Sequence, residues 1–168
     1  MQKLSQDILK IIGVLNKYKV EFLIVGGVGA VLHGSNISTK DIDVCPKNDH
    51  ENFTRLSNAL KELGARLRGA EGIDIPIVPE LLENIQISTW STVFGDLVVI
   101  LNIPSGINGE LLRYSELYVN QVDIPLYGVV VHVASLKDIM ASKRHVARPK
   151  DLAVLPELEK LLKRKNQE

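Results

Sequence analysis

The sequence predicts a mixed α/β fold of the α+β kind, in which helices flank a single mixed β-sheet. Short apolar runs of strand length alternate with longer segments in which apolar residues recur at helical spacing. Glycine and proline residues separate these segments. The chain has 168 residues, which is enough for one domain with a substantial core. We therefore expect a single domain over 1–168, with a sheet-bearing core over 20–134 and a helical segment over 135–164.

Composition narrows the class of protein further. The formal net charge is zero, so no generally basic surface for nucleic acid is implied. The single cysteine excludes an internal disulfide framework. The start of the chain lacks the pattern of a secretory signal, and no apolar stretch approaches the ~20 residues of a membrane span. We expect a soluble cytoplasmic protein with no membrane partner.

The first part of the chain is expected to form helix, strand, short helix, strand and helix. Apolar residues recur at helical spacing in the two long helices, and Asn48 or Asp49 can cap the second of them. Gly34 is expected to end the short helix, because glycine tolerates the left-handed conformation that follows a helix. The expected ranges are 3–19 and 50–64 for the long helices, and 21–25 and 41–45 for the strands.

The rest of the chain is expected to form strands and short helices before two C-terminal helices. Turn residues at 94–95 and 125–126 each separate two strands. The segment 135–138 matches a capping box, and Pro149 suits the first turn of a last helix. The expected ranges are 85–89, 96–102, 119–124 and 127–133 for strands, and 79–84, 110–118, 135–145 and the residues from 149 onward for helices.

An acidic pair follows a glycine turn in this pattern. On a strand, Asp41 and Asp43 would point to one face, roughly 7 Å apart along the chain. Such carboxylates suit Mg²⁺, with Mn²⁺ as the alternative. The turn at Gly26 and Gly27 suits phosphate, because a helix N-terminus offers backbone N–H groups, and Gly27 is expected to need its missing side chain. The combination indicates phosphoryl or nucleotidyl transfer, whereas an exposed strand end is the alternative for the acidic pair.

The acidic pair and the glycine turn belong to a longer motif, which consists of Gly26-Gly27, His33-Gly34 and Thr39-Lys40-Asp41-Ile42-Asp43. This motif resembles the opening motif of the nucleotidyltransferase superfamily of the polymerase-β-like kind. Within it, the sequence is most similar to the small bacterial branch that includes the AbiE-type toxin nucleotidyltransferases. Segments 92–99 and 133–151 resemble, respectively, the strand that supplies a third carboxylate and the branch's C-terminal segment. The similarity covers roughly residues 20–160.

The resemblance implies Mg²⁺-dependent transfer of an NMP from an NTP to a hydroxyl of RNA, a protein or a small molecule. It also implies a catalytic metal site with a third carboxylate beside the acidic pair. The short C-terminal region leaves little room for an acceptor-binding domain, so a partner subunit or a homo-oligomer is expected. If the chain is a toxin–antitoxin component, an antitoxin would be a further partner. The residues implied to bind the nucleotide are Gly26, Gly27, His33, Thr39, Lys143 and Asp151.

Simpler roles stay open for four of these residues. His33 can cap or pack at the end of its helix. Thr39 can orient the backbone at Asp41. Lys143 can be a solvated helix residue, and Asp151 can favour the positive end of a helix dipole.

Two positions depart from the family pattern. Ile37 stands where an arginine is frequent, and Val98 stands where the third carboxylate belongs. Asp96 lies on the same face two residues earlier, and a strand shift or bulge at Gly95 would bring it into place. We expect Asp96 to act as the third metal ligand and catalytic residue. The alternatives are a catalytically impaired fold that binds nucleotide or protein, and a toxin–antitoxin component.

Overall fold

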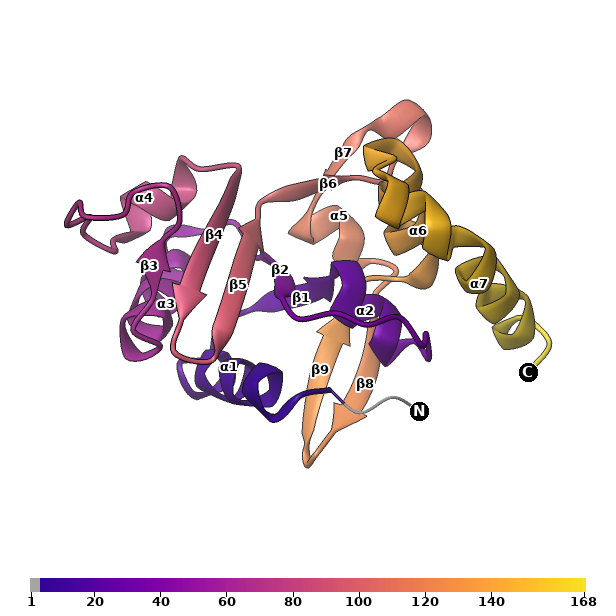
Figure 1. The fold of residues 1–168 in the computed structure, drawn as a ribbon, viewed down its shortest axis with the longest axis horizontal. Coiled ribbons are helices and arrows are strands. Elements are labelled where there is room, and N and C mark those ends of the chain that lie inside the picture. The colour runs from indigo at the N-terminus through magenta and orange to yellow at the C-terminus, as the bar shows by residue number, and fades with distance from the viewer. Residues whose placement is uncertain (1–3) are drawn as a thin grey trace.

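The computed structural model describes residues 4–168 and forms one mixed α/β unit (Figure 1). A seven-stranded sheet has the order β3-β4-β5-β2-β1-β9-β8. The pairs β2–β5 and β1–β9 are parallel, and the other pairs are antiparallel. This confirms the mixed sheet expected from the sequence. Its strands are β1 (Phe22–Val25), β2 (Ile42–Pro46), β3 (Arg66–Leu67), β4 (Ile87–Thr92), β5 (Gly95–Ile100), β8 (Val122–Leu126) and β9 (Val129–Val133).

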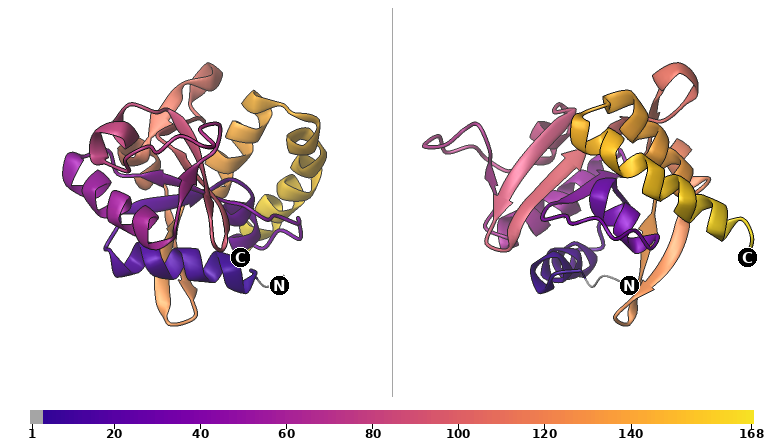
Figure 2. Two further views of the ribbon diagram at one scale, coloured as in Figure 1. Left: turned by 60° about the vertical axis from the view of Figure 1, so that its left-hand side comes forward. Right: turned by 45° about the vertical axis from the view of Figure 1, so that its right-hand side comes forward.

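The helices pack on both sides of this sheet (Figure 2). α1 packs on α3 and β5, whereas α2 packs on β1, β2 and α6. α6 also packs on α7, which carries the C-terminus. No helix within residues 4–168 is long and apolar enough to cross a bilayer. The helices are α1 (Gln6–Lys17), α2 (Gly26–Leu32), α3 (His50–Glu62), α4 (Pro79–Glu83), α5 (Tyr114–Tyr118), α6 (Leu136–Val146) and α7 (Pro149–Lys165).

Local capping explains where the long helices begin. The Asp49 side chain accepts a hydrogen bond from the Asn52 amide at 2.8 Å, which confirms the cap expected for α3. Ser135 accepts from the Asp138 amide at 3.1 Å and caps α6. Gly34 follows α2 with a φ of +111°, in the left-handed region favoured by glycine.

The structure differs from the sequence expectation in its short strands. The segment expected as one strand over 96–102 is divided between β5 and β6 (Asn102–Pro104), because the chain leaves the main sheet near Leu101. β6 pairs instead with β7 (Leu111–Arg113), and a 3₁₀ turn (Ile107–Gly109) lies between them. These strands are too short for periodicity to identify them.

The two faces of β4 and β5 have opposite environments. Leu97, Val99 and Trp90 are almost fully buried in the core against which α1 packs. Val98 and Thr89 alternate with them and therefore point to the other face, which no helix covers in Figure 1. That uncovered face is one wall of the cavity described next.

Candidate active site

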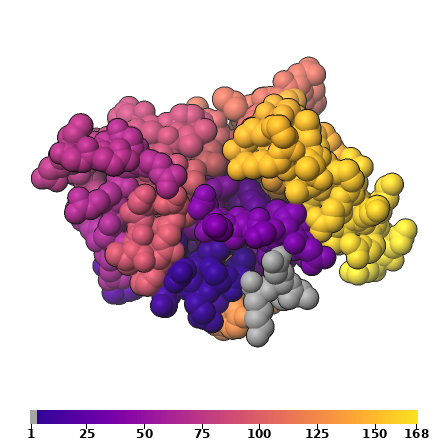
Figure 3. All heavy atoms as spheres, viewed as in Figure 1, coloured from indigo at the N-terminus to yellow at the C-terminus, as the bar shows by residue number. Residues whose placement is uncertain are grey.

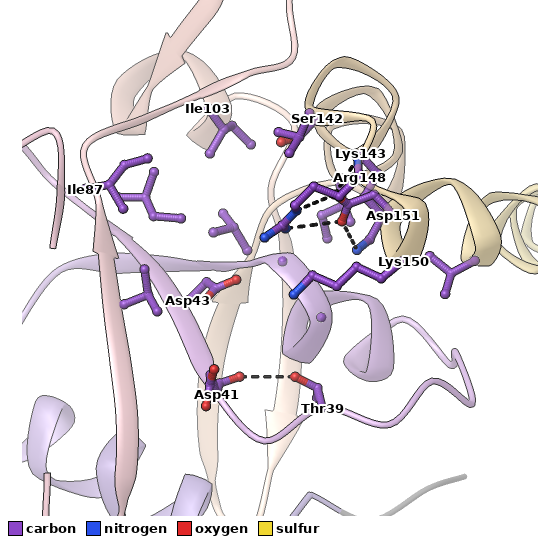
Figure 4. Close-up of a pocket in the computed structure, with 18 of the residues that line it drawn as sticks. Thr39, Asp41, Asp43, Ile87, Ile103, Ser142, Lys143, Arg148, Lys150 and Asp151 are labelled. Atoms are coloured by element: carbon purple, nitrogen blue, oxygen red, sulfur yellow. Dashed lines mark hydrogen bonds and ion pairs between the residues drawn. The ribbon is translucent and has the colours of Figure 1, made fainter. Parts of the chain in front are cut away.

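A cavity of about 520 Å³ lies between the start of α2, the uncovered face of β4 and β5, and the helices α6 and α7. In the space-filling view it opens between the strand region and the C-terminal helices (Figure 3). An acidic pair lies on one side of it, and three cations lie on the other (Figure 4). The predicted site residues that it brings together are Gly26, Gly27, Thr39, Asp41, Asp43, Lys143 and Asp151.

The glycine turn allows one carboxylate to lie against the backbone. Gly26 has a φ of +63°, a left-handed conformation that other residues adopt at a cost. A Cβ at Gly26 would overlap the Asp43 carboxylate. The overlap follows from the antiparallel register, in which Val25 pairs with Asp43. The position with the strictest need for glycine is therefore Gly26.

Gly27 has a different neighbour. A Cβ there would lie 2.9 Å from Thr39 Oγ1. The Thr39 hydroxyl in turn donates a hydrogen bond to the Asp41 backbone carbonyl at 3.2 Å. Thr39 thus orients the backbone at Asp41, as one of the two sequence-based interpretations proposed. The absence of a side chain at Gly27 keeps this loop close to the turn.

The two carboxylates of the acidic pair differ in environment. Asp41 is exposed immediately before β2, whereas Asp43 is half-buried within it. Burial, followed by the negative charge of Asp41, raises the pKa of Asp43 to about 6. The positive charges of Lys143, Arg148 and Lys150 oppose this shift without cancelling it. Asp43 is therefore harder to ionise in this cavity than an ordinary aspartate.

This donor set fits one hard cation. Two carboxylate side chains in one cavity suit Mg²⁺, which usually takes one or two carboxylates and fills its other positions with water and phosphate oxygens. Among residues 4–168, no cluster of three or more His, Cys, Asp or Glu side chains is arranged to hold a metal ion. The third carboxylate expected from the sequence is therefore not assembled beside Asp41 and Asp43.

The opposite side of the cavity is built around a buried aspartate. Asp151 is 2% exposed, and Arg148 Nε donates to its Oδ2 at 2.7 Å. Lys143 Nζ lies 3.6 Å from its Oδ1. Burial acts to raise the pKa of Asp151, but the hydrogen bond from Arg148 and the charges of Arg148 and Lys143 outweigh it and lower that pKa. Asp151 therefore positions two cations at the cavity.

The local sequence accounts for this arrangement. Pro149 begins α7, where its missing N–H costs nothing. Asp151 is the third residue of the helix, and it also accepts the Arg148 backbone N–H at 3.3 Å in a capping box. α6 ends at Val146, so Lys143 in its last turn comes close to the start of α7. Lys150 also lines the cavity (Figure 4).

The strand register decides the position of the third carboxylate. β2 and β5 pair so that Val98 lies beside Asp43, and Val98 lines the cavity. The β4–β5 hairpin pairs regularly up to Gly95, so the bulge that would have shifted Asp96 is not formed. Asp96 instead forms an ion pair with Arg68 and lies outside the cavity. The structure therefore separates Asp96 from the cavity that Asp41 and Asp43 line.

His33 also lies outside the cavity. It is 5% exposed, and its Nε2 is 2.8 Å from the carbonyl oxygen of Ala134. Burial lowers its pKa, so the neutral ring is favoured. The contact ties the end of α2 to the segment between β9 and α6. His33 therefore has the packing role that the sequence left open beside nucleotide binding.

Sequence reasoning missed the apolar wall of the cavity. Ile87, Ile100 and Ile103 line it together with Val98. The two-residue spacing of Val98 and Ile100 could have indicated that these side chains share one strand face. The pairing of Ile100 with Ile87 is visible only in the structure. Arg148 and Lys150 were noticed as part of the C-terminal segment but were not assigned to the site.

No protein-family model and no curated protein matches the sequence. Solved structures match the fold. LnuA, a lincosamide antibiotic adenylyltransferase solved with lincomycin bound, aligns with a TM-score of 0.63 at 13% identity, over 96% of this chain and 99% of that one. The antibiotic-resistance factor ANT(2'')-Ia aligns at 0.58 and 14%, over 92% and 80%. A putative nucleotidyltransferase from Thermotoga maritima aligns at 0.52 and 18%, over 96% and 91%.

At these identities the similarity concerns the fold. The chain thus has the mixed α/β fold of nucleotidyltransferases over nearly its whole length. This agrees with the superfamily that the motifs resemble. The AbiE-type branch is not tested by these structures.

Proposed function

We propose that this protein is a metal-dependent nucleotidyltransferase that moves an NMP from an NTP to an acceptor oxygen. One observation carries the proposal: across a single cavity, Asp41 and Asp43 face the cations Lys143, Arg148 and Lys150. A carboxylate pair suits a divalent cation, and fixed positive side chains suit phosphates. The nucleotidyltransferase fold supports the same reaction class.

Each residue has a distinct task in this proposal. Asp41 and Asp43 hold Mg²⁺, which when bound neutralises phosphate charge and polarises the α-phosphate. Arg148 and Lys143, positioned by Asp151, contact the non-bridging oxygens of the triphosphate. Positioning and electrostatic stabilisation supply most of the catalysis in phosphoryl transfer, so this division of charge is what the reaction requires.

Calorimetric titration of ATP, GTP, CTP and UTP, each with Mg²⁺, tests the binding step. We expect at least one NTP to bind the wild type, and binding to be lost in the double variant Asp41→Ala/Asp43→Ala. Glu159→Gln on α7 is the control, because its exposed ion pair with Arg144 lies outside the cavity. Equal binding by the wild type and the double variant would reject the proposal.

A second candidate is a module that binds nucleotide without transferring it. Val98 favours this candidate, because it occupies the strand position beside Asp43. The nucleotidyltransferase superfamily, which the sequence resembles, has a carboxylate at that position. Release of pyrophosphate from a bound NTP separates the two candidates. The AbiE-type branch, an antitoxin partner and a cytoplasmic location stay predictions from the sequence.

A further inference from the structure

The wall beside the acidic pair is apolar. Val98 on β5 is the direct neighbour of Asp43 on β2. Thr89 on β4 is the neighbour of Val98 on its other side. Ile100 and Ile87 continue the same face, and Ile87 is 59% exposed. Figure 4 shows Ile87 on this side, opposite the cationic helices. A molecule lying next to the acidic pair would contact hydrocarbon on this side.

The cavity also lacks an available proton acceptor. Within residues 4–168, no His, Glu, Cys or Tyr lines it, and its carboxylates are Asp41, Asp43 and Asp151. Under the proposed function the first two hold the cation. Asp151 is buried and engaged by Arg148 and Lys143, which stabilise its charged form. A neutral hydroxyl would therefore have no side chain to take its proton as it attacks.

We propose that the acceptor is an organic oxyanion, a carboxylate or a phosphate monoester, carried on an apolar body. This inference rests on the proposed function and specifies its acceptor. Such an oxygen is ionised at neutral pH and needs no general base. Lys143, Arg148 and Lys150 line the same cavity, and the positive charge of these three cations is shared between the triphosphate and the acceptor. Its apolar body contacts Val98, Ile100 and Ile87.

The step balances without a proton acceptor. A lone pair of the acceptor oxyanion forms a bond to the α-phosphorus of the NTP. The bond from that phosphorus to the oxygen bridging the α- and β-phosphates breaks, and pyrophosphate leaves with the electron pair. A carboxylate acceptor yields an acyl–nucleotide anhydride, and a phosphate monoester yields a pyrophosphate-linked nucleotide.

Binding of matched acceptors is the first test. Hexanoate, hexyl phosphate and 1-hexanol share an alkyl chain and differ in the reacting group. They are titrated into the wild type saturated with Mg²⁺ and a non-hydrolysable NTP. We expect at least one anion to bind about tenfold or more tightly than the alcohol, as charge-assisted contacts would provide. Equal or tighter binding of 1-hexanol would contradict the proposal, and so would failure of both anions to bind.

A matched pair of variants tests the wall. Val98→Asp adds a negative charge beside Asp43, whereas Val98→Asn adds a polar group of the same shape without charge. We expect the aspartate variant to lose anion binding and the asparagine variant to lose much less. If the two variants bind the anion equally, the negative charge of the acceptor does not lie beside position 98, and the proposal is contradicted.

The chemistry of the product is the decisive test. The wild type is incubated with α-labelled NTPs, Mg²⁺ and a deproteinised cell extract. Labelled product that hydroxylamine cleaves indicates a carboxylate acceptor, and product that only a nucleotide pyrophosphatase cleaves indicates a phosphate acceptor. Product resistant to both indicates a hydroxyl acceptor and overturns the inference. NTP binding without any labelled product also overturns it, whereas loss of NTP binding itself overturns the proposed function.

Discussion

Asp43 and Asp151 face each other across the cavity from opposite electrostatic situations. Burial and a like charge raise the pKa of Asp43 to about 6, whereas Arg148 and Lys143 keep the pKa of Asp151 low although it is almost fully buried. The charge of Asp151 is satisfied within the protein. The charge of Asp43 is opposed by burial and by Asp41, so under the proposed function Asp43 is the carboxylate available to a cation. Two aspartates of one cavity thus differ in role: Asp151 holds cations within the protein, whereas the proposed function assigns Asp43 to a ligand.

The largest effect on stability is expected from Asp151→Asn. Removing one partner of a buried ion pair leaves cations without compensation, and since Arg148 is 58% exposed we expect a loss of about 2 kcal/mol rather than more. Urea unfolding at neutral pH measures this loss. Glu159→Gln, on the same helix, should change stability by less than about 0.5 kcal/mol. Similar losses of unfolding free energy in both variants would contradict a structural role for Asp151.

Gly26→Ala tests the surroundings of Asp43. The substitution places a Cβ where the Asp43 carboxylate lies and requires a left-handed alanine. The strained backbone alone costs about 1–2 kcal/mol. Gly27→Ala is the matched control, because it meets only the movable Thr39 side chain and has no positive φ. Thermal unfolding of both variants should place Gly26→Ala clearly below Gly27→Ala, and the reverse order would contradict the geometry of the turn.

Asp43→Asn should increase the stability of the ligand-free protein. Because the folded state raises the pKa of Asp43, folding favours the protonated carboxyl, and the wild type loses stability as pH rises from about 4 to about 6. The neutral variant avoids that loss, so we expect a gain of about 1–2 kcal/mol at about pH 8, after allowance for partial exposure, and none near pH 4. Urea unfolding at the two pH values measures it.

The control for this prediction is Asp41→Asn. Asp41 is exposed, so its own substitution should add less than about 0.5 kcal/mol, by relieving repulsion of Asp43. If Asp43→Asn destabilises the protein at high pH, its charge is satisfied within the fold and the contrast with Asp151 fails.

The smallest effect on stability is expected from Lys150→Ala. Lys150 is exposed at the start of α7 and lines the cavity, so its removal should change the unfolding free energy by less than about 0.5 kcal/mol. The affinity for Mg²⁺–NTP should nevertheless fall about fivefold or more, because one charge-assisted contact to phosphate is lost. Calorimetry measures the affinity. Unchanged affinity would restrict the phosphate contacts to Lys143 and Arg148.

Local patterns were sufficient for most of the elements. Apolar periodicity predicted α1 and α3, the cap at Asp49 and the box at Ser135 predicted two helix starts, and the glycine turn predicted the change from β1 to α2. The two-residue spacing of Asp41 and Asp43 brought both into one cavity as expected. Each of these features depends on neighbours within a few positions along the chain, which sequence displays directly.

The third carboxylate could not be assigned in the same way. Asp96 and Val98 share a strand face, so alternation alone favours neither. The pairing of β2 with β5 places Val98 beside Asp43, and the pairing of β3 with β4 brings Arg68 near Asp96. Register between strands depends on the packing of the whole sheet, and here it reverses the expectation that Asp96 is a metal ligand.

Residue types and short spacings were thus enough to indicate the fold class, the acidic pair and the glycine turn, because these depend on local backbone geometry. The environment of each buried or half-buried carboxylate depends on contacts between segments that are distant in the sequence. Asp43 meets an apolar strand and an exposed aspartate, whereas Asp151 meets Arg148 and Lys143. The free energy of a buried charge depends on the groups that surround it in space, and the linear order of residues does not record them.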